Sequence, residues 1–498
     1  MEASKIWSIA KKRGFVWGSS EIYGGIAGFY DYAHLGAAVK RKWEDLWLKY
    51  FLKLGDYYFI DSANVLPAKC LKASGHEEHF ADILVECNRC NNIFKADLLI
   101  EEQTGKSAEA LTVSEINEQT KALQIKCPEC KTPSLGQATL FNMMFPVSIG
   151  TKQVEEAYLR PETAQGVYLN FKREFEALRK KLPLGLAIIG RAYRNEISPR
   201  QGMYRLRELT QAELQIFFDP NKFDSQIDFK ELEDYKIRLQ FVEDREKNKT
   251  SIVDCKELIQ RLPRYYVYHL AKCQQFYLDA LKVPIQKFRF YEKSEKERAF
   301  YTKIHFDIEL NLETLGGFRE VAGVHYRSDY DLKRHQEYSG ESFEVNIGGR
   351  KFIPHVLELS FGVDRNIWAL FDLFFAEEKE RTILKLPAKL APHQLGVFPL
   401  VNKDNLPDKA TEIYKALKKK FDVFYDDSGS IGRRYARMDE IGTPFGITID
   451  YQTFEDGTVT IRERDSTKQV RVKVDELAQV IRGLVDEELK FEDLVRTQ

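Results

Sequence analysis

The sequence has no long apolar run and almost no net charge. No stretch of its 498 residues approaches the roughly 20 consecutive apolar residues that cross a bilayer, so it predicts no transmembrane helix. The first residues, MEASKIWSIAKKRGF, lack the apolar core and small-residue cleavage site of a secretory signal. With a net charge of −1, any nucleic-acid surface must be a local patch. We therefore expect a cytoplasmic protein with no membrane partner.

Cysteine is scarce, and the sequence contains no internal repeat and no low-complexity tract. Its seven cysteines fit a reducing compartment if they bind metal or stay reduced. Hydrophobic residues make up 43% and charged residues 30%, as in a folded globular protein. The length suits roughly two to four domains of about 100–200 residues each.

Changes in periodicity divide the chain into four predicted parts. Residues 1–67 open the main domain, and residues 68–136 form a polar insertion whose middle has no apolar stripe wide enough for a core. Residues 137–387 continue the main domain, with a charged helical insertion at about 222–285. From 388 to 498 strands and helices alternate, which predicts a small separate α/β domain.

Two tryptophans lie on the apolar stripe of an amphipathic helix predicted near residues 36–51. Trp43 and Trp47 give this stripe two very large apolar side chains, which must be buried against another surface. The stripe fits either a place in the core of the chain or an interface with a second subunit.

Two C-x-x-C pairs, CNRC and CPEC, lie in the insertion. They supply four thiolates, which suit a tetrahedral zinc ion. The predicted ligands are Cys87, Cys90, Cys127 and Cys130. A closed shell leaves no open position for a substrate, so this zinc should brace the insertion. Four reduced thiols without metal remain an alternative, redox activity is less favoured, and the nearby His76 and His79 are interpreted as surface or packing residues.

The segment AYRNEISPRQGMYRLRELTQAELQIF, residues 192–217, carries a charged alternation. From Met203 onward every second residue forms one face, with Arg205, Arg207, Gln211 and Glu213 on it. An arginine fork matches phosphate, and a carboxylate matches an ammonium. A solvated face with cross-strand ion pairs is the alternative interpretation.

Four stretches follow one another in an order typical of a known enzyme family. SSEIYGGIAGFYDY, LRPETAQG, YRNEISPRQG…RLRELTQAE and VLELSFGVDR resemble blocks of the class II aminoacyl-tRNA synthetases, specifically of the homodimeric glycyl-tRNA synthetases. The resemblance extends from about residue 13 to about residue 465. It implies an α+β fold: an antiparallel sheet flanked by helices, a zinc-knuckle insertion and a C-terminal α/β anticodon-binding domain.

The resemblance also implies roles for individual residues. Arg194, Glu196 and Arg365 match the catalytic residues that hold the α-phosphate, the adenine and the far phosphates. The implied ATP-binding residues are Arg194, Asn195, Glu196, Tyr204, Arg205, Arg207, Glu320, Val321, Gly362 and Arg365. The implied glycine-binding residues are Lys95, Glu162, Gln211, Glu213, Glu358 and Ser360, with the three glutamates around the ammonium.

Some positions depart from the family pattern. His34 in DYAHLG stands where the family has a proline near the dimer interface. Lys95 replaces an arginine near the substrate. Leu209 and Leu359 replace a phenylalanine and a proline, and both are expected to border the glycine pocket. None of these changes removes a catalytic group.

The C-terminal part resembles the anticodon-binding domain of the glycyl, threonyl, prolyl and histidyl enzymes. Its basic residues suit either RNA phosphates or a solvated helix face. They are Lys418, Lys419 and Lys420 on one predicted helix and Arg433, Arg434 and Arg437 on another.

The implied function is a glycine-specific ligase that forms glycyl-adenylate and passes the glycyl group to the 3′ end of tRNA(Gly). The implied cofactors are ATP, Mg²⁺ and a structural Zn²⁺, and the implied partners are glycine, tRNA(Gly) and a second copy of the chain. Three rivals remain: a prolyl or threonyl enzyme, a synthetase-like RNA-binding or regulatory protein without catalysis, and a zinc-ribbon nucleic-acid adaptor, which would explain only the cysteines.

Overall fold

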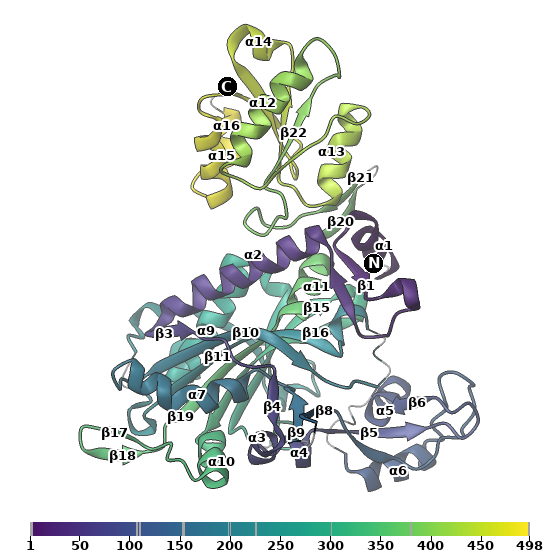
Figure 1. Cartoon of the computed structure of the whole chain (residues 1–498), viewed down its shortest axis with the longest axis vertical. Coiled ribbons are helices and arrows are strands. Elements are labelled where there is room, and N and C mark those ends of the chain that lie inside the picture. Colours follow the sequence, from purple (N-terminus) through teal and green to yellow (C-terminus); the bar gives the residue numbers. More distant parts are fainter. Residues whose placement is uncertain are drawn as a thin grey trace.

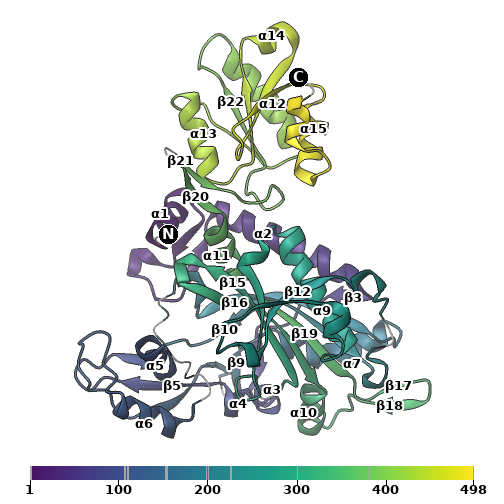
Figure 2. The ribbon, with the colours of Figure 1, turned by 180° about the vertical axis from the view of Figure 1, so that it is seen from behind.

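The computed structural model describes residues 3–105, 108, 111–151, 155–197, 199, 201–224, 227–299, 301–378 and 381–496. Figure 1 shows a large sheet with its helices, a C-terminal unit above it, and the cysteine-containing insertion below and to one side. Figure 2 shows the same regions from behind. In the described part of the chain, no helix is long and apolar enough to cross a membrane.

A nine-stranded sheet of described residues forms the centre of the large unit. Its strands in spatial order are β13 (Ser251–Asp254), β12 (Lys236–Gln240), β14 (Phe288–Glu292), β15 (Ile304–Leu312), β16 (Gly317–Ser328), β19 (His355–Gly362), β11 (Glu208–Phe218), β10 (Leu184–Tyr193) and β3 (Tyr57–Phe59). Neighbouring strands are antiparallel except for β12 with β14 and β10 with β3. The predicted antiparallel sheet is therefore confirmed.

Alternation along β11 separates the two faces of this sheet. Ala212, Leu214 and Ile216 are fully buried in the main core, whereas Gln211 and Glu213 point to the opposite face. The predicted period of two is correct, but the strand begins at Glu208 rather than near 203. A 3₁₀ turn at Gly202–Tyr204 precedes it, so Arg205 and Arg207 lie in a loop.

Helices cover both faces of the sheet. The main core holds residues of α2 (His34–Phe51), α9 (Arg264–Gln275) and α11 (Val363–Phe374), while α7 (Ala164–Ala177) and α10 (Tyr330–Ser339) contribute to a second core against the other face. Trp43 and Trp47 have no exposed surface and belong to the main core. The interface interpretation of this pair is therefore wrong, because the chain buries its own stripe.

The helix expected in the charged segment from 228 to 251 is wrong. That segment contains β12 and leads into β13 (Ser251–Asp254), and both strands extend the main sheet. Ile237 and Leu239 are fully buried at alternate positions of β12. Their period of two is too short, among so many charged residues, to predict a strand from the sequence. Helices of this region, α8 (Cys255–Leu258) and α9, come later in the chain.

The insertion has a small core of its own. Its described elements are β5 (Ala81–Glu86), β6 (Ile93–Lys95), α5 (Ala96–Thr104), α6 (Val113–Ala122) and β7 (Thr139–Asn142). Leu99 and Ile116 pack with Cys87 and Cys127 in this core. The expectation that its charged middle supplies no core is thus wrong, because Ile116 of α6 is fully buried.

Several smaller elements connect the insertion and the main sheet. The insertion is joined to the sheet through α3 (Ala68–Ala73), α4 (His76–His79) and a three-stranded sheet of β4 (Val65–Pro67), β9 (Glu155–Leu159) and β8 (Phe145–Ile149). The other elements outside the C-terminal unit are α1 (Ala3–Arg13), β1 (Val16–Gly18), β2 (Tyr30–Tyr32) and the hairpins β17 (Val345–Ile347)–β18 (Arg350–Phe352) and β20 (Phe375–Glu378)–β21 (Arg381–Leu384).

The C-terminal unit alternates strands and helices as predicted. It contains β22 (Leu395–Pro399), α12 (Leu406–Lys418), β23 (Val423–Tyr425), α13 (Ile431–Glu440), β24 (Phe445–Ile449), α14 (Gln452–Asp456), β25 (Thr458–Glu463), β26 (Gln469–Lys473), α15 (Leu477–Asp486) and α16 (Phe491–Arg496). The short helices α14 and α16 were not predicted. The strands form one mixed sheet in the order β23-β22-β24-β25-β26.

The basic residues of this unit differ in exposure. Lys418, Lys419 and Lys420 are exposed at and just after the end of α12. Arg434 is only 1% exposed, and its guanidinium donates to carbonyl oxygens of Asp427 and Gly429. It therefore stabilises the fold and is not available to RNA phosphate.

Candidate active site

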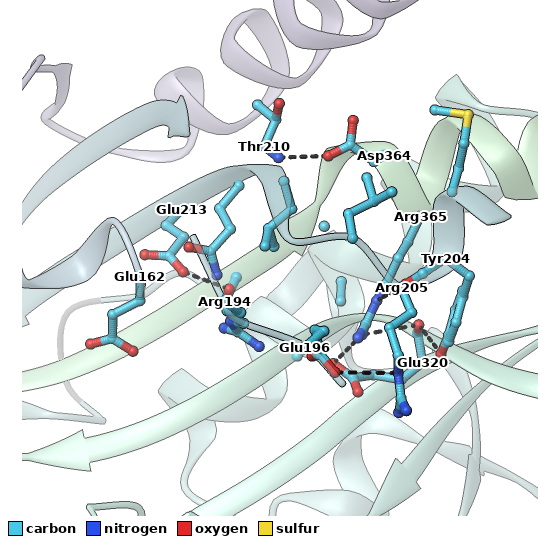
Figure 3. Close-up of a pocket in the computed structure, with 18 of the residues that line it drawn as sticks. Glu162, Arg194, Glu196, Tyr204, Arg205, Thr210, Glu213, Glu320, Asp364 and Arg365 are labelled. Atoms are coloured by element: carbon cyan, nitrogen blue, oxygen red, sulfur yellow. Dashed lines mark hydrogen bonds and ion pairs between the residues drawn. The ribbon is translucent and has the colours of Figure 1, made fainter. Parts of the chain in front are cut away.

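A polar pocket lies on the sheet face opposite the main core. Its floor comes from β11, β16 and β19, and its rim comes from the loop after β10 and the start of α11. At one end α7 covers the sheet, where the rings of Phe171 and Phe217 stack at 4.2 Å. Next to that contact, Gln211 and Glu213 of β11 line the pocket, and Figure 3 shows Glu213 at one of its ends.

Arginine side chains and their acceptors gather at one end of the pocket. Nη1 of Arg365 lies 3.0 Å from Oε1 of Glu320, and its guanidinium is 4.7 Å from the centre of the Tyr204 ring. The hydroxyl of Tyr204 donates to the backbone oxygen of Glu320. Arg205 lies 3.7 Å from Glu196, which makes a looser ion pair. Figure 3 shows these five side chains pointing toward one another.

Two further arginines predicted to bind ATP have different surroundings. Arg194 lines the pocket, and its Nε donates to the carbonyl of Pro161 at 3.2 Å. Arg207 does not line it. Its guanidinium donates to the carbonyls of Glu196 and Ala27, so it holds the loop after β10 against the N-terminal segment.

Asp364 fixes the junction from which Arg365 projects. Its carboxylate accepts the hydroxyl of Tyr32 at 2.6 Å and the backbone amide of Thr210 at 2.5 Å. One buried carboxylate therefore ties β2, β11 and the first turn of α11 together. Gly362 is the last residue of β19, and α11 begins immediately after it at Val363.

Glu213 is the carboxylate without a cation at the other end of the pocket. It is 2% exposed, and its two oxygens accept the hydroxyls of Thr163 at 2.7 Å and Ser360 at 2.8 Å. No Lys, Arg or His among the described residues lies within 4 Å of it. Burial raises the pKa of Glu213 to about 7, and the nearby carboxylates of Glu358 and Glu162 add to the rise.

Glu162 and Glu358, by contrast, already have cationic partners. Arg327 is 1% exposed and lies 2.9 Å from Glu358, 2.9 Å from Asp331 and 3.5 Å from Glu162. Despite burial, which acts in the opposite direction, Arg327 and His325 lower the pKa of Glu358 to about 2. The pKa of Glu162 is also lowered, because His76 and Arg327 outweigh its burial. Of these three glutamates, Glu213 is therefore the one with no cation within 4 Å among the described residues.

Of the other residues that the sequence predicted near the substrates, some line the pocket and some are buried in the main core. Gln211 lines the pocket and accepts the amide of Thr163, and Leu209 also lines it. Leu359 does not, because the strand alternation turns it into the main core. Val321 is likewise buried in that core.

Lys95 and Asn195 lie outside the set of side chains that line the pocket. Lys95 is in β6 of the insertion, where its ammonium is 3.0 Å from Asp82. The backbone amide of Asn195 donates to the carbonyl of Met143.

The cysteine pairs meet as predicted. The Sγ atoms of Cys87, Cys90, Cys127 and Cys130 all lie within 4.8 Å of one another. Sγ of Cys87 is 3.6 Å from Sγ of Cys130, and the other cross pair has the same separation. A zinc ion with Zn–S bonds of about 2.3 Å requires S–S separations of about 3.8 Å. The donor set therefore fits zinc, while Cys70, Cys255 and Cys273 are separate and buried.

Sequence reasoning missed Arg327, His325 and Thr163. Arg327 and His325 occupy alternate positions of β16 together with Gly323, a few residues after Glu320. A period-two reading of GVHYR would have placed all three on one face. His76 was interpreted as a surface or packing residue, yet it is 4% exposed with Nε2 3.5 Å from Glu162.

The fold and site define a class of protein. Residues 145–374 match the tRNA synthetase class II core domain (G, H, P, S and T), and residues 394–484 match the anticodon binding domain. A solved prolyl-tRNA synthetase from Cryptosporidium parvum shares the fold, with a TM-score of 0.58 and 15% identity over 97% of this chain and 77% of that one. The chain has the architecture of a class II aminoacyl-tRNA synthetase.

Similar sequences narrow the class to one family. The glycine–tRNA ligase of Thermococcus kodakarensis is 37% identical over 96% of this chain and 98% of its own length. Those of Pyrococcus furiosus and Aeropyrum pernix are 38% and 37% identical, over 96% and 98% of this chain and 98% of each relative. The chain belongs to the glycine–tRNA ligase family, and it is an aminoacyl-tRNA ligase.

Proposed function

We propose that the polar pocket activates glycine with ATP and that the glycyl group then passes to the 3′ end of tRNA(Gly). The observation that carries this assignment is Glu213. It is a buried carboxylate with no cation within 4 Å among the described residues, at the far end of a pocket whose other end holds arginines. An uncompensated buried carboxylate is costly, and the ammonium of an amino acid would neutralise it.

The glycine end of the pocket would use Glu213 as the ammonium acceptor. The hydroxyls of Thr163 and Ser360 already donate to its two oxygens and hold the carboxylate in place. Glu162 and Glu358 would shape the surroundings while paired with Arg327. Selection of glycine is a matter of exclusion, because a rigid and crowded pocket rejects an added methyl group by steric clash.

The ATP end would place the α-phosphorus near Arg194 and Arg205 and the far phosphates near Arg365. An oxygen of the glycine carboxylate attacks the α-phosphorus in line. The new O–P bond forms as the bond to the β-phosphate oxygen breaks, and pyrophosphate leaves. Arginine forks would stabilise the charge that builds on the phosphoryl oxygens. The protein thus contributes position and electrostatics, with no covalent nucleophile.

Two metal ions fit the residues present. Mg²⁺ is commonly bound by one or two carboxylates together with substrate phosphates, and Glu320 beside Arg365 suits that role. When bound, Mg²⁺ neutralises phosphate charge. The four clustered cysteines would hold a structural Zn²⁺ that braces the insertion.

The C-terminal unit would bind the anticodon arm, and we propose a homodimer. The match of residues 394–484 to an anticodon binding domain supports the first point. Ile22, Tyr23 and Ile26 are 88%, 87% and 66% exposed, and this apolar surface beside β2 supports the second. Light scattering coupled to gel filtration tests the dimer.

A cytoplasmic location and the domain limits 1–67, 68–136, 137–387 and 388–498 remain predictions from the sequence.

Amino-acid-dependent ATP–pyrophosphate exchange tests the proposed reaction. Glycine should support exchange, whereas proline, threonine, serine and alanine should not. A faster rate with one of the larger amino acids would move the assignment to another class II enzyme. Absence of exchange with every amino acid, together with tight tRNA binding, would favour an RNA-binding protein without catalysis.

A further inference from the structure

Two cross-strand rows run over the pocket floor. One row contains Glu213, Ser360, Gly323 and Asp307, on β11, β19, β16 and β15. The neighbouring row on the same face contains Gln215, Glu358, His325 and His305 on the same four strands. The proposed ammonium acceptor therefore lies in one row, and its paired neighbour Glu358 lies in the other.

Gly323 has no side chain, so it leaves a space in the first row. The ring of His325, which belongs to the second row, occupies that space. A Cβ atom added at Gly323 would lie 2.6 Å from both Cε1 and Nε2 of the His325 ring. Real Cβ atoms essentially never make contacts that short. The ring of His325 therefore leans across the position of the absent side chain, and it can do so only because residue 323 is glycine.

Both ring nitrogens of His325 have close polar neighbours. Nδ1 lies 2.7 Å from Oε1 of Glu358, which is an ion-pair distance without the angle of a hydrogen bond. Nε2 lies 3.0 Å from Nε2 of His305, which in turn lies 2.8 Å from Oδ1 of Asp307. The side chain of His325 is 13% exposed, so these contacts are largely shielded from water. The ring is held at its far side by β15 and faces Glu358 at its near side.

We propose that His325 is a positioning residue of the glycine pocket, where its ring, admitted by Gly323 and tethered by His305, fixes the carboxylate of Glu358. This inference rests on the glycine assignment proposed above. Glu358 has two oxygens: Oε2 is taken by Arg327 and Gln215, and His325 faces Oε1. Without His325, Oε1 loses the ring that lies 2.7 Å from it and is free to rotate toward Glu213, where it would change the geometry of the ammonium site.

The test measures the KM for glycine and, separately, the KM for ATP in pyrophosphate exchange. Replacing a buried charged contact should raise the glycine KM of His325→Ala by about tenfold or more. The ATP KM should stay within about twofold, because the phosphate end does not contact His325. His325→Asn keeps a polar group near the position of Nδ1, so its glycine KM should stay within about threefold of the wild-type value.

A double-mutant cycle tests the role of Gly323. Gly323→Ala should raise the glycine KM because the added methyl displaces the ring. Adding that change to His325→Ala should alter the KM by no more than about twofold, since the ring is already absent. Independent effects that multiply in the double variant would overturn the proposal.

Other outcomes are equally decisive. A folded His325→Ala protein with wild-type glycine KM overturns the proposal, as does an equal rise in both KM values or a lack of rescue by asparagine. If His325→Ala does not fold, His305→Asn removes the contact between His305 and the His325 ring instead. An unchanged glycine KM in that variant would then refute the proposal. Failure of the proposed function is a separate result, in which the wild-type protein shows no glycine-dependent exchange.

Discussion

Glycine binding should weaken in mild acid because Glu213 has to be ionised to accept an ammonium. Burial and the neighbouring carboxylates raise the pKa of this carboxyl to about 7. Below that pH the empty pocket holds a neutral acid, and above it a carboxylate. The apparent glycine KM should therefore rise as the pH falls through 7. The fraction of enzyme competent to bind sets the size of this change.

A pKa of about 7 fixes the expected curve. The competent fraction is about nine-tenths at pH 8, half at pH 7 and about one-tenth at pH 6. The glycine KM should thus double between pH 8 and pH 7 and reach roughly tenfold its pH 8 value at pH 6. Pyrophosphate exchange at saturating ATP measures this curve, with the ATP KM recorded at each pH as the control.

Glu213→Gln is the matched variant because it keeps the shape and removes the charge. Its glycine KM at pH 8 should rise by about a hundredfold, as expected when a buried charged contact worth about 3 kcal/mol is lost. The glycine KM of this variant should also no longer rise as the pH falls through 7. A flat wild-type curve between pH 6 and pH 8 would refute the reasoning, and so would a rise that persists unchanged in Glu213→Gln.

Three further predictions concern other parts of the molecule. Arg365→Ala should slow pyrophosphate exchange by about a hundredfold or more through loss of phosphate stabilisation, with little change in melting temperature; near-normal exchange would contradict the proposed role. Purified protein should contain about one zinc per chain by elemental analysis, and Cys127→Ser should lower both zinc content and thermal stability; a metal-free sample with wild-type stability would argue against the site. Arg434→Ala should destabilise the C-terminal unit by about 3 kcal/mol in denaturant unfolding, because buried carbonyl groups lose their donor, whereas Lys418→Ala should leave stability unchanged and weaken tRNA binding.

Local periodicity predicted those parts of the fold in which one face of each element is buried. The C-terminal strands and the longer helices α12, α13 and α15 were predicted in order because each carries its own apolar stripe, as Leu395–Pro399 and Leu477–Asp486 do. The segment around β12 was misread because only Ile237 and Leu239 mark its period. Its position in the sheet depends on pairing with β14, which lies about 50 residues further along the chain. Such long-range pairing overrides local pattern.

The sequence predicted which residue types line the site, but it did not predict which of the carboxylates have cationic partners. Arg194, Glu196, Glu213, Glu358 and Arg365 do line one pocket. Which carboxylates have partners depends on Arg327, and that residue reaches Glu358 only because β16 and β19 pair in one particular register. Leu359 was predicted to border the pocket because the sequence does not give the strand register. It follows Glu358 directly in β19, and consecutive residues of a strand point to opposite faces of the sheet.

The uneven pairing of the acidic residues explains how one pocket can be stable when empty and selective when filled. Arg327 neutralises Glu358 and approaches Glu162, so these two carboxylates remain ionised at neutral pH without a ligand. Of the three glutamates, only Glu213 has no cation within 4 Å among the described residues, and burial together with the carboxylates of Glu358 and Glu162 raises its pKa to about 7. An ammonium that enters the pocket relieves the cost of the buried charge at Glu213 and finds no second carboxylate lacking a cation. The free energy of glycine binding would therefore be concentrated at Glu213, in the same cross-strand row as Ser360 and Gly323.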